Sequence, residues 1–385
     1  MDIFNTATHI FYVAAVFIPV LALLIFVHEF GHFIVAKKSG VKVNEFGFGF
    51  PPRIWGKRVG ETIYSINLLP LGGFVNVEGE NGEDLVEQGQ NQVSRREGIR
   101  DNFDPARSFV SKPLHIKLSI LYAGVLMNIF LAFVIFSLLQ VIGVPTGISD
   151  EANDPNAKVL ISDVVKGSPA WIAGIKTNDL IKEMRIENNV FYPNKLTQTQ
   201  KLIKDNAGRE ITLVILRGKE IKEFNIIPRV NPPPGEGALG IGLLLAGNIS
   251  YPWYEAPWRG AWITVATTIT MISGVAHLLG QLFYEHTLSG DVAGPIGIAS
   301  LTWQISALGL SHLLYFVAII SLNLAVLNAL PLPALDGGRA FILLIEKIRR
   351  KNFSLRTMQW VNGIVFALLI LFVLLVSIRD IERML

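Results

Sequence analysis

One short motif near the start of the chain could bind a metal ion and activate water. It reads His28-Glu29-Phe30-Gly31-His32. Histidines four residues apart lie on one face of a helix and can share a metal ion. Glu29 follows His28 directly, where its carboxylate can reach a metal-bound water. This HExxH spacing is the signature of zinc peptidases, so the motif predicts a zinc site whose bound water Glu29 can touch.

HExxH supplies two ligands, whereas a catalytic zinc usually takes three from the protein. The chain has no cysteine, so the third ligand must be His, Asp or Glu. The other histidines form no second pair: they are His9, His115, His277, His286 and His312. The best acidic candidate is Asp336, in the segment NALPLPALDGG, where Pro331 and Pro333 break a helix and let the carboxylate turn inward. The alternative is that Asp336 caps the helix that follows.

Composition narrows the class of protein. The chain has 385 residues, of which 51% are hydrophobic and 17% charged, whereas globular domains average about 25% charged residues. A disordered chain, a disulfide scaffold and a thiolate zinc site are excluded. The net charge of +3 is too small to indicate nucleic acid as a partner.

The apolar residues are pooled in runs long enough to form membrane helices, since a bilayer core needs roughly 20 apolar residues. Five runs stand out: Phe11 to Val27, Leu118 to Leu139, Gly260 to Tyr284, Ala307 to Leu330, and Val361 to Ile378. The first continues into the HExxH motif and is expected to be a retained helix rather than a signal peptide. An ionisable residue in a membrane helix is costly and marks function.

Lysine and arginine beside the runs predict the orientation. Lys37, Lys38 and Lys42 follow the first run, and a basic loop covers residues 339–356. Three apolar runs separate these two basic segments, and an odd number of crossings would place them on opposite sides. Both segments face the cytoplasm only if one of the three runs does not cross the membrane. We therefore expect four spans, with 260–284 as a re-entrant or interfacial helix, and an extracytoplasmic N-terminus.

These observations predict a polytopic α-helical membrane protein with an inserted domain. The expected regions are residues 1–36 (first span), 37–117 (cytoplasmic, with a β-hairpin near 61–77 that the resemblance described below implies to be membrane-associated), 118–143 (second span), 157–230 (inserted domain), 231–300 (linker and outer helices), 307–338 (third span), 339–360 (cytoplasmic basic helix) and 361–379 (fourth span).

The inserted segment 157–230 has the pattern of a small globular module. A strand, a short helix capped by Ser168 with Pro169 at its first position, a strand, a helix and two strands follow in order. Its segment VVKGSPAWIAGIKTNDLI resembles a PDZ domain of the circularly permuted bacterial type. That resemblance implies an extracytoplasmic domain that binds a peptide or chain end. A spacer or a size filter is the alternative.

HEFGH and LNALPLPALDGG, in this order, resemble the site-2 protease family of intramembrane zinc metalloproteases, and the closest subgroup is the bacterial regulator-of-sigma-E protease type. INLLPLGGFV (66–75), residues 108–133 and GPIGI (294–298) are similar to further family segments. The resemblance implies Zn²⁺ held by His28, His32 and Asp336, with Glu29 and Asn328 as catalytic residues. It implies substrate binding by an edge strand and a helix residue, namely Leu71, Gly72, Gly73, Phe74 and Asn128. For Asn128, helix–helix packing is the alternative.

The family implies a protease of the bacterial cytoplasmic (inner) membrane that acts in the lipid bilayer on transmembrane substrates, such as anti-sigma factors or signal-peptide remnants. Nucleic acid is not an expected partner. A zinc transporter or a catalytically inactive PDZ scaffold would be the alternatives. The chain departs from many relatives in having room for a single PDZ domain, and its segment 77–113 matches poorly.

Overall fold

The fold is seen in a computed structural model that describes residues 3–80, 105–147, 150, 157–187, 189–218, 220–284 and 293–384. It divides into two compact units, a membrane unit of Met1–Leu138 with Pro257–Leu385, and an inserted unit of Leu139–Ala256. Five helices are long and apolar enough to cross a membrane: Phe11–Lys38, Leu114–Ile142, Ala256–Leu278, Leu310–Ala329 and Arg356–Glu382. Each coincides with one of the five predicted apolar runs.

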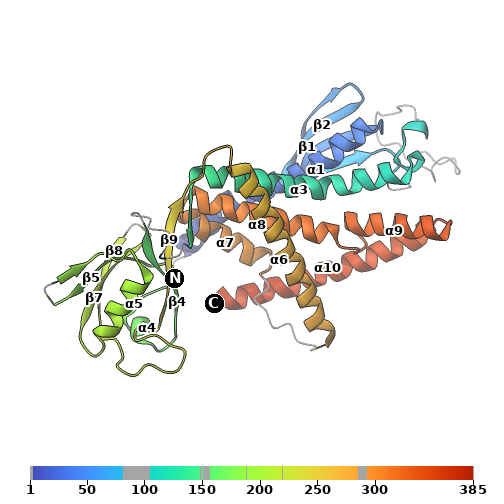
Figure 1. The fold of residues 1–385 in the computed structure, drawn as a ribbon. Helices are drawn as coiled ribbons and strands as arrows, with labels where there is room; N and C mark the ends of the chain where they lie inside the picture. The colour runs from blue at the N-terminus through green and yellow to red at the C-terminus, as the bar shows by residue number, and fades with distance from the viewer. Residues whose placement is uncertain are drawn as a thin grey trace. The chain divides into compact units, whose positions relative to one another are not determined.

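Helices form most of the membrane unit (Figure 1). They are α1 (Ile3–Lys38), α3 (Leu114–Ile142), α6 (Ala256–Tyr284), α7 (Pro295–Ala307), α8 (Leu310–Ala329), α9 (Asp336–Arg349) and α10 (Leu355–Met384). Two short 3-10 helices, Pro105–Arg107 and Phe109–Ser111, precede α3. The break predicted at Pro331 and Pro333 is confirmed, because α8 ends at Ala329 and α9 begins at Asp336.

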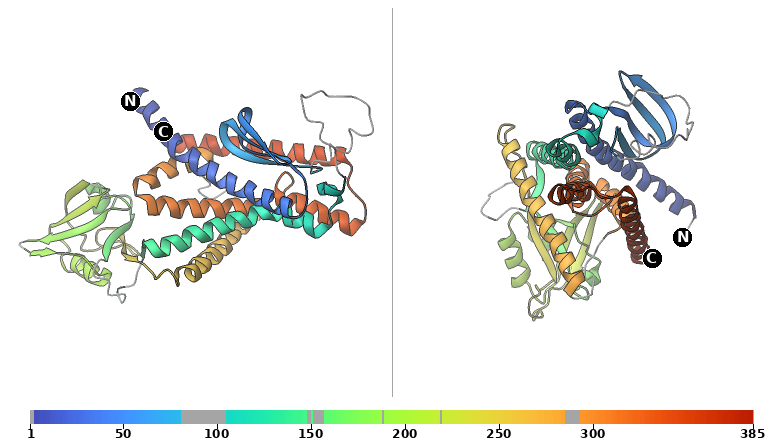
Figure 2. Two further views of the ribbon diagram at one scale, coloured as in Figure 1. Left: turned by 90° about the horizontal axis from the view of Figure 1, so that it is seen from above. Right: turned by 90° about the vertical axis from the view of Figure 1, so that its right-hand side faces the viewer.

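Two strands, β1 (Val43–Val59) and β2 (Thr62–Val77), form a curved antiparallel sheet beside α1 (Figure 2). The hairpin is longer than the predicted 61–77. Residues 46–48 have partners in both halves of β2, so Phe48 pairs with Ile66 and with Gly73. Beside the sheet turn, Glu61 binds Lys37 of α1 at 3.2 Å and Arg107 at 2.7 Å. These ion pairs hold the sheet against the end of α1.

A small core joins the sheet to the helices that carry the motifs. Its buried members come from α1 and the loop after it, both strands, the second 3-10 helix, α3 and α9, namely Ala36, Val41, Val43, Val77, Phe109, Ile120, Leu121 and Ala340. Next to it lies a buried ion pair in which Lys42 Nζ is 2.9 Å from Glu78 Oε2. The ends of α1, α3 and α9 are therefore packed together around one apolar centre.

The last helix is tied to the GPIGI segment. Asp380 of α10 is buried and accepts hydrogen bonds from the backbone N–H groups of Gly294 and Gly297, at 3.2 and 2.8 Å. A Cβ on Gly294 would lie 2.7 Å from Asp380 Oδ2. Glycine is therefore needed here because the carboxylate caps the start of α7.

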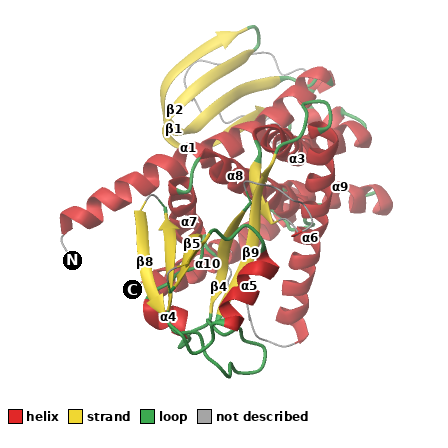
Figure 3. Ribbon diagram, turned by 60° about the vertical axis from the view of Figure 1, so that its left-hand side comes forward, coloured by secondary structure: helices red, strands yellow, loops and turns green. Residues whose placement is uncertain are grey.

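The inserted unit is an antiparallel sheet with two helices beside its strands (Figure 3). The strands are β3 (Val144–Gly147), β4 (Lys158–Val164), β5 (Leu180–Ile186), β6 (Asn189–Phe191), β7 (Ile211–Arg217), β8 (Glu220–Ile226) and β9 (Ile241–Ile249), in the order β3-β9-β4-β5-β7-β8 with β6 on β5. The helices are α4 (Pro169–Ala173) and α5 (Leu196–Asp205).

Local sequence signals in this unit are confirmed. Ser168 accepts a hydrogen bond from Trp171 N, and Pro169 begins α4. The unit is nevertheless larger than the predicted 157–230, because β9 pairs with β4 and with β3. Residues 241–249, which the sequence assigned to a linker region, are part of the sheet.

Candidate metal and catalytic site

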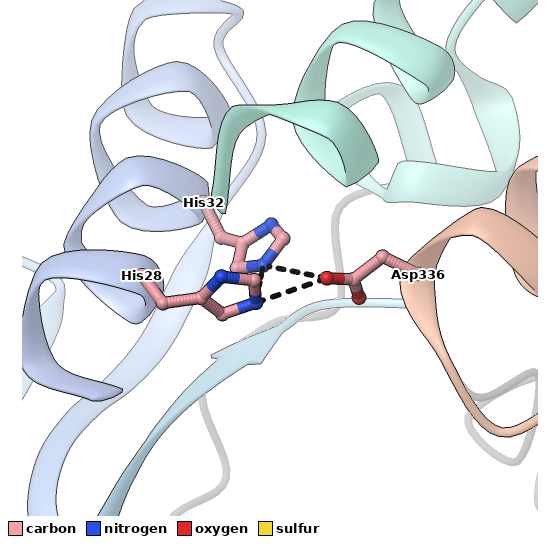
Figure 4. A group of neighbouring side chains, drawn as sticks. All are labelled: His28, His32 and Asp336. Atoms are coloured by element: carbon pink, nitrogen blue, oxygen red, sulfur yellow. Dashed lines mark hydrogen bonds and ion pairs between the residues drawn. The ribbon is translucent and has the colours of Figure 1, made fainter. Parts of the chain in front are cut away.

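Three side chains from two distant segments converge in the membrane unit (Figure 4). His28 and His32 lie on one face of α1, and each is 9% exposed. Asp336 Oδ2, at the start of α9, is 3.0 Å from His28 Nε2 and 3.4 Å from His32 Nε2. The two histidine Nε2 atoms are 3.2 Å apart. Three ligand-type atoms therefore point at one position.

These separations fit a tetrahedral zinc site. Zinc binds histidine nitrogen and carboxylate oxygen at about 2.0–2.2 Å, so the edges of its coordination tetrahedron measure roughly 3.3 Å. The observed ligand–ligand distances of 3.0, 3.2 and 3.4 Å match those edges. The nitrogen and oxygen donors also suit zinc. This part of the chain can hold Zn²⁺ through His28, His32 and Asp336.

Asp336 does not act as a helix cap. The N-cap position of α9 is Leu335, no side chain caps it, and the Asp336 carboxylate is turned toward the histidines. The two following glycines allow close packing, since a Cβ on Gly337 would overlap the backbone of Ala329, and one on Gly338 that of Leu332. They let α9 start against the end of α8, which presents Asp336 to α1.

Contacts behind the histidines come from α3. His32 Nδ1 lies 2.8 Å from the carbonyl oxygen of Ile120 and donates to it, which leaves Nε2 free as a ligand. His28 Nδ1 lies 3.3 Å from Nδ2 of Asn128. One turn before Asn128, a Cβ on Gly124 would overlap His32 Nε2 and lie 2.6 Å from His28 Cε1. The glycine makes room for both rings.

Beside the ligands lies a cavity of about 260 Å³. Its walls are formed by Ile25, His28, Glu29, Asn128, Leu324, Asn328, Ala334, Leu335 and Asp336. Glu29 and Asn328, the two predicted catalytic residues, therefore share one space with two of the predicted ligands. A carboxylate, an amide and a metal-binding cluster around one cavity can together add water to a peptide carbonyl.

Of the predicted edge-strand residues, Gly73 reaches the site. A Cβ there would lie 3.3 Å from Glu29 Cγ, so the backbone of β2 passes beside the Glu29 side chain. Gly72 instead faces Phe50, and the Phe74 ring covers Gly47. Leu71 is in β2, but its side chain lies outside the described residues.

An ion pair close to the ligands was missed by the sequence reasoning. Glu80, just after β2, is bonded to Arg339 on the first turn of α9. Burial raises the pKa of Glu80, against the opposing effect of Arg339. The pair links the end of the sheet to the helix that carries Asp336. In the sequence, the one indication of this ion pair is the positive charge of Arg339 directly after Leu335-Asp336-Gly337-Gly338.

Comparison with known proteins gives a consistent result. The model of peptidase family M50 matches residues 16–372. A putative zinc metalloprotease of Clostridium perfringens is 33% identical over 374 residues, which cover 93% of this chain and 95% of that protein. One of Nostoc is 32% identical, covering 91% of each chain. The regulator of sigma-W protease RasP of Bacillus subtilis is 29% identical, covering 96% of this chain and 98% of its own length.

Proposed function

The chain belongs to peptidase family M50, and from that premise we propose that His28, His32 and Asp336 hold its zinc ion while Glu29 and Asn328 act on the scissile peptide. It is an integral membrane protein and a site-2-type intramembrane zinc metalloprotease that acts in regulated intramembrane proteolysis. The observation that carries the residue assignment is the convergence of three ligand atoms beside a cavity lined by Glu29 and Asn328.

Each residue then has a defined task. When bound, zinc supplies a Lewis acid and lowers the pKa of a water molecule to about 7. Glu29 accepts the proton of the attacking water and delivers it to the leaving amine. The Asn328 amide donates a hydrogen bond to the developing oxyanion, a contact worth about 3 kcal/mol.

The decisive test is Glu29→Gln, with zinc content and cleavage of a short transmembrane peptide measured on the same sample. The variant should keep its zinc and lose cleavage by a factor of about 10²–10⁴. Retained cleavage would remove Glu29 from the mechanism. If the wild type and Glu29→Gln both transported zinc across vesicle membranes at the same rate, the zinc-transporter alternative would be favoured.

A matched pair of asparagines tests the second role. Asn328 lines the cavity, whereas Asn323, on the same helix, is exposed. Asn328→Ala should lower kcat by about 10²–10³, and Asn323→Ala should leave it unchanged. Equal effects of both substitutions would contradict the oxyanion role.

We infer that the substrate is held as an added strand along the second half of β2. Residues 73–76 pair with β1 on one side, and Gly73 passes beside Glu29. A helical peptide has its carbonyls engaged, so it must be unwound before attack. Gly73→Val should raise KM and lower kcat/KM because its side chain would meet Glu29. An unchanged kcat/KM would contradict strand addition at this place.

The orientation remains as the basic residues predict it, with four spans and α6 re-entrant or interfacial on the outer side. Since the chain has no native cysteine, Gly290→Cys and Arg350→Cys can be labelled one at a time in intact cells. An impermeant thiol reagent should reach position 290 and not position 350. If α6 spanned, the pattern would be reversed, and the reagent would reach position 350 and not position 290.

The inserted unit is proposed as an extracytoplasmic PDZ-like gate that excludes substrates with bulky outer domains until another protease trims them. Val144 and Ile249 are strand partners, so excising residues 145–248 leaves ends that a short turn can rejoin. The excised protein should cleave untrimmed substrates while cleaving a trimmed one as before. Loss of activity on the trimmed substrate would argue for a direct catalytic need.

The substrates proposed are transmembrane proteins whose cleavage releases a signal. One relative is named a regulator of sigma-W protease, which favours an anti-sigma factor. Signal-peptide remnants are the second class. The purified enzyme can be given an anti-sigma transmembrane segment and a signal-peptide remnant in separate assays. The kcat/KM values would show which of the two substrate classes is preferred.

A further inference from the structure

Asn128 is placed where it can control the zinc ligand His28 rather than the substrate. It lies in the middle of α3, is fully buried, and has its side-chain Nδ2 3.3 Å from His28 Nδ1. Its own backbone carbonyl accepts a hydrogen bond from Ser321 Oγ of α8 at 2.8 Å. The residue is thus fixed from two sides while its amide touches a histidine.

The direction of that amide corresponds to one tautomer of His28. With Nδ2 donating to Nδ1, the ring proton resides on Nε2, which faces Asp336 Oδ2 at 3.0 Å. A zinc ligand needs the opposite arrangement, because Nε2 must offer its lone pair and Nδ1 must carry the proton. Nδ1–H then needs an acceptor.

The acceptor is present in the same side chain. Within the described residues, Asn128 Oδ1 is buried and has no hydrogen-bond partner. A half-turn of the amide exchanges its two ends, which are almost equal in shape. It would bring Oδ1 to the position 3.3 Å from His28 Nδ1 that Nδ2 occupies.

We propose that Asn128 is a positioning residue whose amide swivels with the state of His28, donating to Nδ1 in the metal-free site and accepting from Nδ1–H when zinc is bound. An amide can do both, since it carries a donor and an acceptor at one place. His32 needs no such partner because the Ile120 carbonyl fixes its tautomer permanently. The proposal rests on the zinc ligands assigned above.

Zinc affinity separates this role from substrate binding. Asn128→Leu keeps the number and branching of the side-chain heavy atoms and removes both functions of the amide, so zinc should bind about 10–100-fold more weakly, as is usual when a partner behind a ligand is lost. Asn128→Asp keeps the acceptor and should bind zinc at least as tightly as the wild type. Competition against a chromophoric chelator in detergent measures both dissociation constants.

Two substitutions serve as controls for packing. Ser321→Ala removes the hydroxyl that holds the Asn128 backbone without changing the amide, and Asn323→Leu alters an exposed asparagine. Both should bind zinc as the wild type does. If Asn128→Leu fails to fold in detergent, Asn128→Ala takes its place in the same comparison.

Cleavage at saturating zinc provides the second readout. If Asn128 acts through His28, added zinc should restore most of the kcat of Asn128→Leu, with KM unchanged. Wild-type zinc affinity of Asn128→Leu, or Asn128→Asp as weak as Asn128→Leu, would overturn the proposal. So would a raised KM that zinc does not correct. A wild-type protein that binds no zinc would instead refute the metal assignment itself.

Discussion

The core of the inserted unit and the candidate metal site of the membrane unit are both buried, yet different contacts hold them. The inserted unit rests on a contiguous apolar core with members such as Met184 and Leu213, drawn from one stretch of chain. The candidate metal site consists of polar side chains from α1 and α9, which come close because glycines such as Gly124 of α3 leave room for them. Apolar cores lose stability gradually when atoms are removed. A metal site depends on the exact positions of its ligands, so a single substitution that displaces one ligand should cause a large loss of zinc affinity.

The largest effect is expected where that close approach is blocked. Gly124→Ala puts a methyl group into the space of His32 Nε2, so both zinc binding and peptide cleavage should fall by more than about 100-fold. Zinc content and cleavage rate measure this. Gly274→Ala, on α6, meets nothing within 4 Å and should change neither. If Gly124→Ala kept the zinc content of the wild type, the histidine rings could move away from the added methyl group, and the prediction would be wrong.

A buried ion pair tests whether the loss of one polar partner in the membrane unit also has a large effect, here on stability. Lys42→Met leaves Glu78 buried without its partner and should cost about 3–5 kcal/mol of unfolding free energy. The double variant Lys42→Met with Glu78→Leu should recover most of it. Unfolding in mixed detergent gives both values. A double variant as unstable as the single one would contradict this account.

The core of the inserted unit should respond in stability alone. Met184→Ala should lower the unfolding free energy of that unit by about 2–5 kcal/mol. Cleavage of a short transmembrane peptide should stay within about twofold, since no site residue lies in this unit. Limited proteolysis of the unit and peptide cleavage report the two quantities. Ile221→Ala, at an exposed position, is the control and should change stability by less than about 0.5 kcal/mol.

The smallest effect concerns Glu61, where hydrogen bonding to Arg107, with further help from Lys37, lowers the pKa from 4.5 to about 2. A lowered folded-state pKa adds stability above the unfolded pKa and loses it as the pH falls. Relative to Glu61→Gln, the wild type should be more stable by at most about 1 kcal/mol at pH 7, because the pair is partly exposed. The difference should vanish between pH 4.5 and about 2. A difference independent of pH would refute the ion-pair explanation.

In both regions the sequence predicts some features and misses others. The cap at Ser168 and the strand β7 follow from local patterns, and the apolar runs appear as helices. The grouping of the histidines with Asp336 was expected because few residue types can complete a zinc site. The Glu80–Arg339 pair and strand β9 were missed, since both depend on partners distant in the chain. Tertiary pairing of this kind leaves no periodic signal.

The proposed zinc ligands His28 and Asp336 are separated by 308 residues. A ribosome adds about 5–20 residues per second, so roughly 15–60 s pass between synthesis of the first and the last ligand. During that interval the nascent chain has the histidines and Glu29 but no third ligand. Hydrolytic capacity is therefore expected only after Asp336 has been added. A chain released early would enter the membrane as an inert fragment rather than as an unregulated protease.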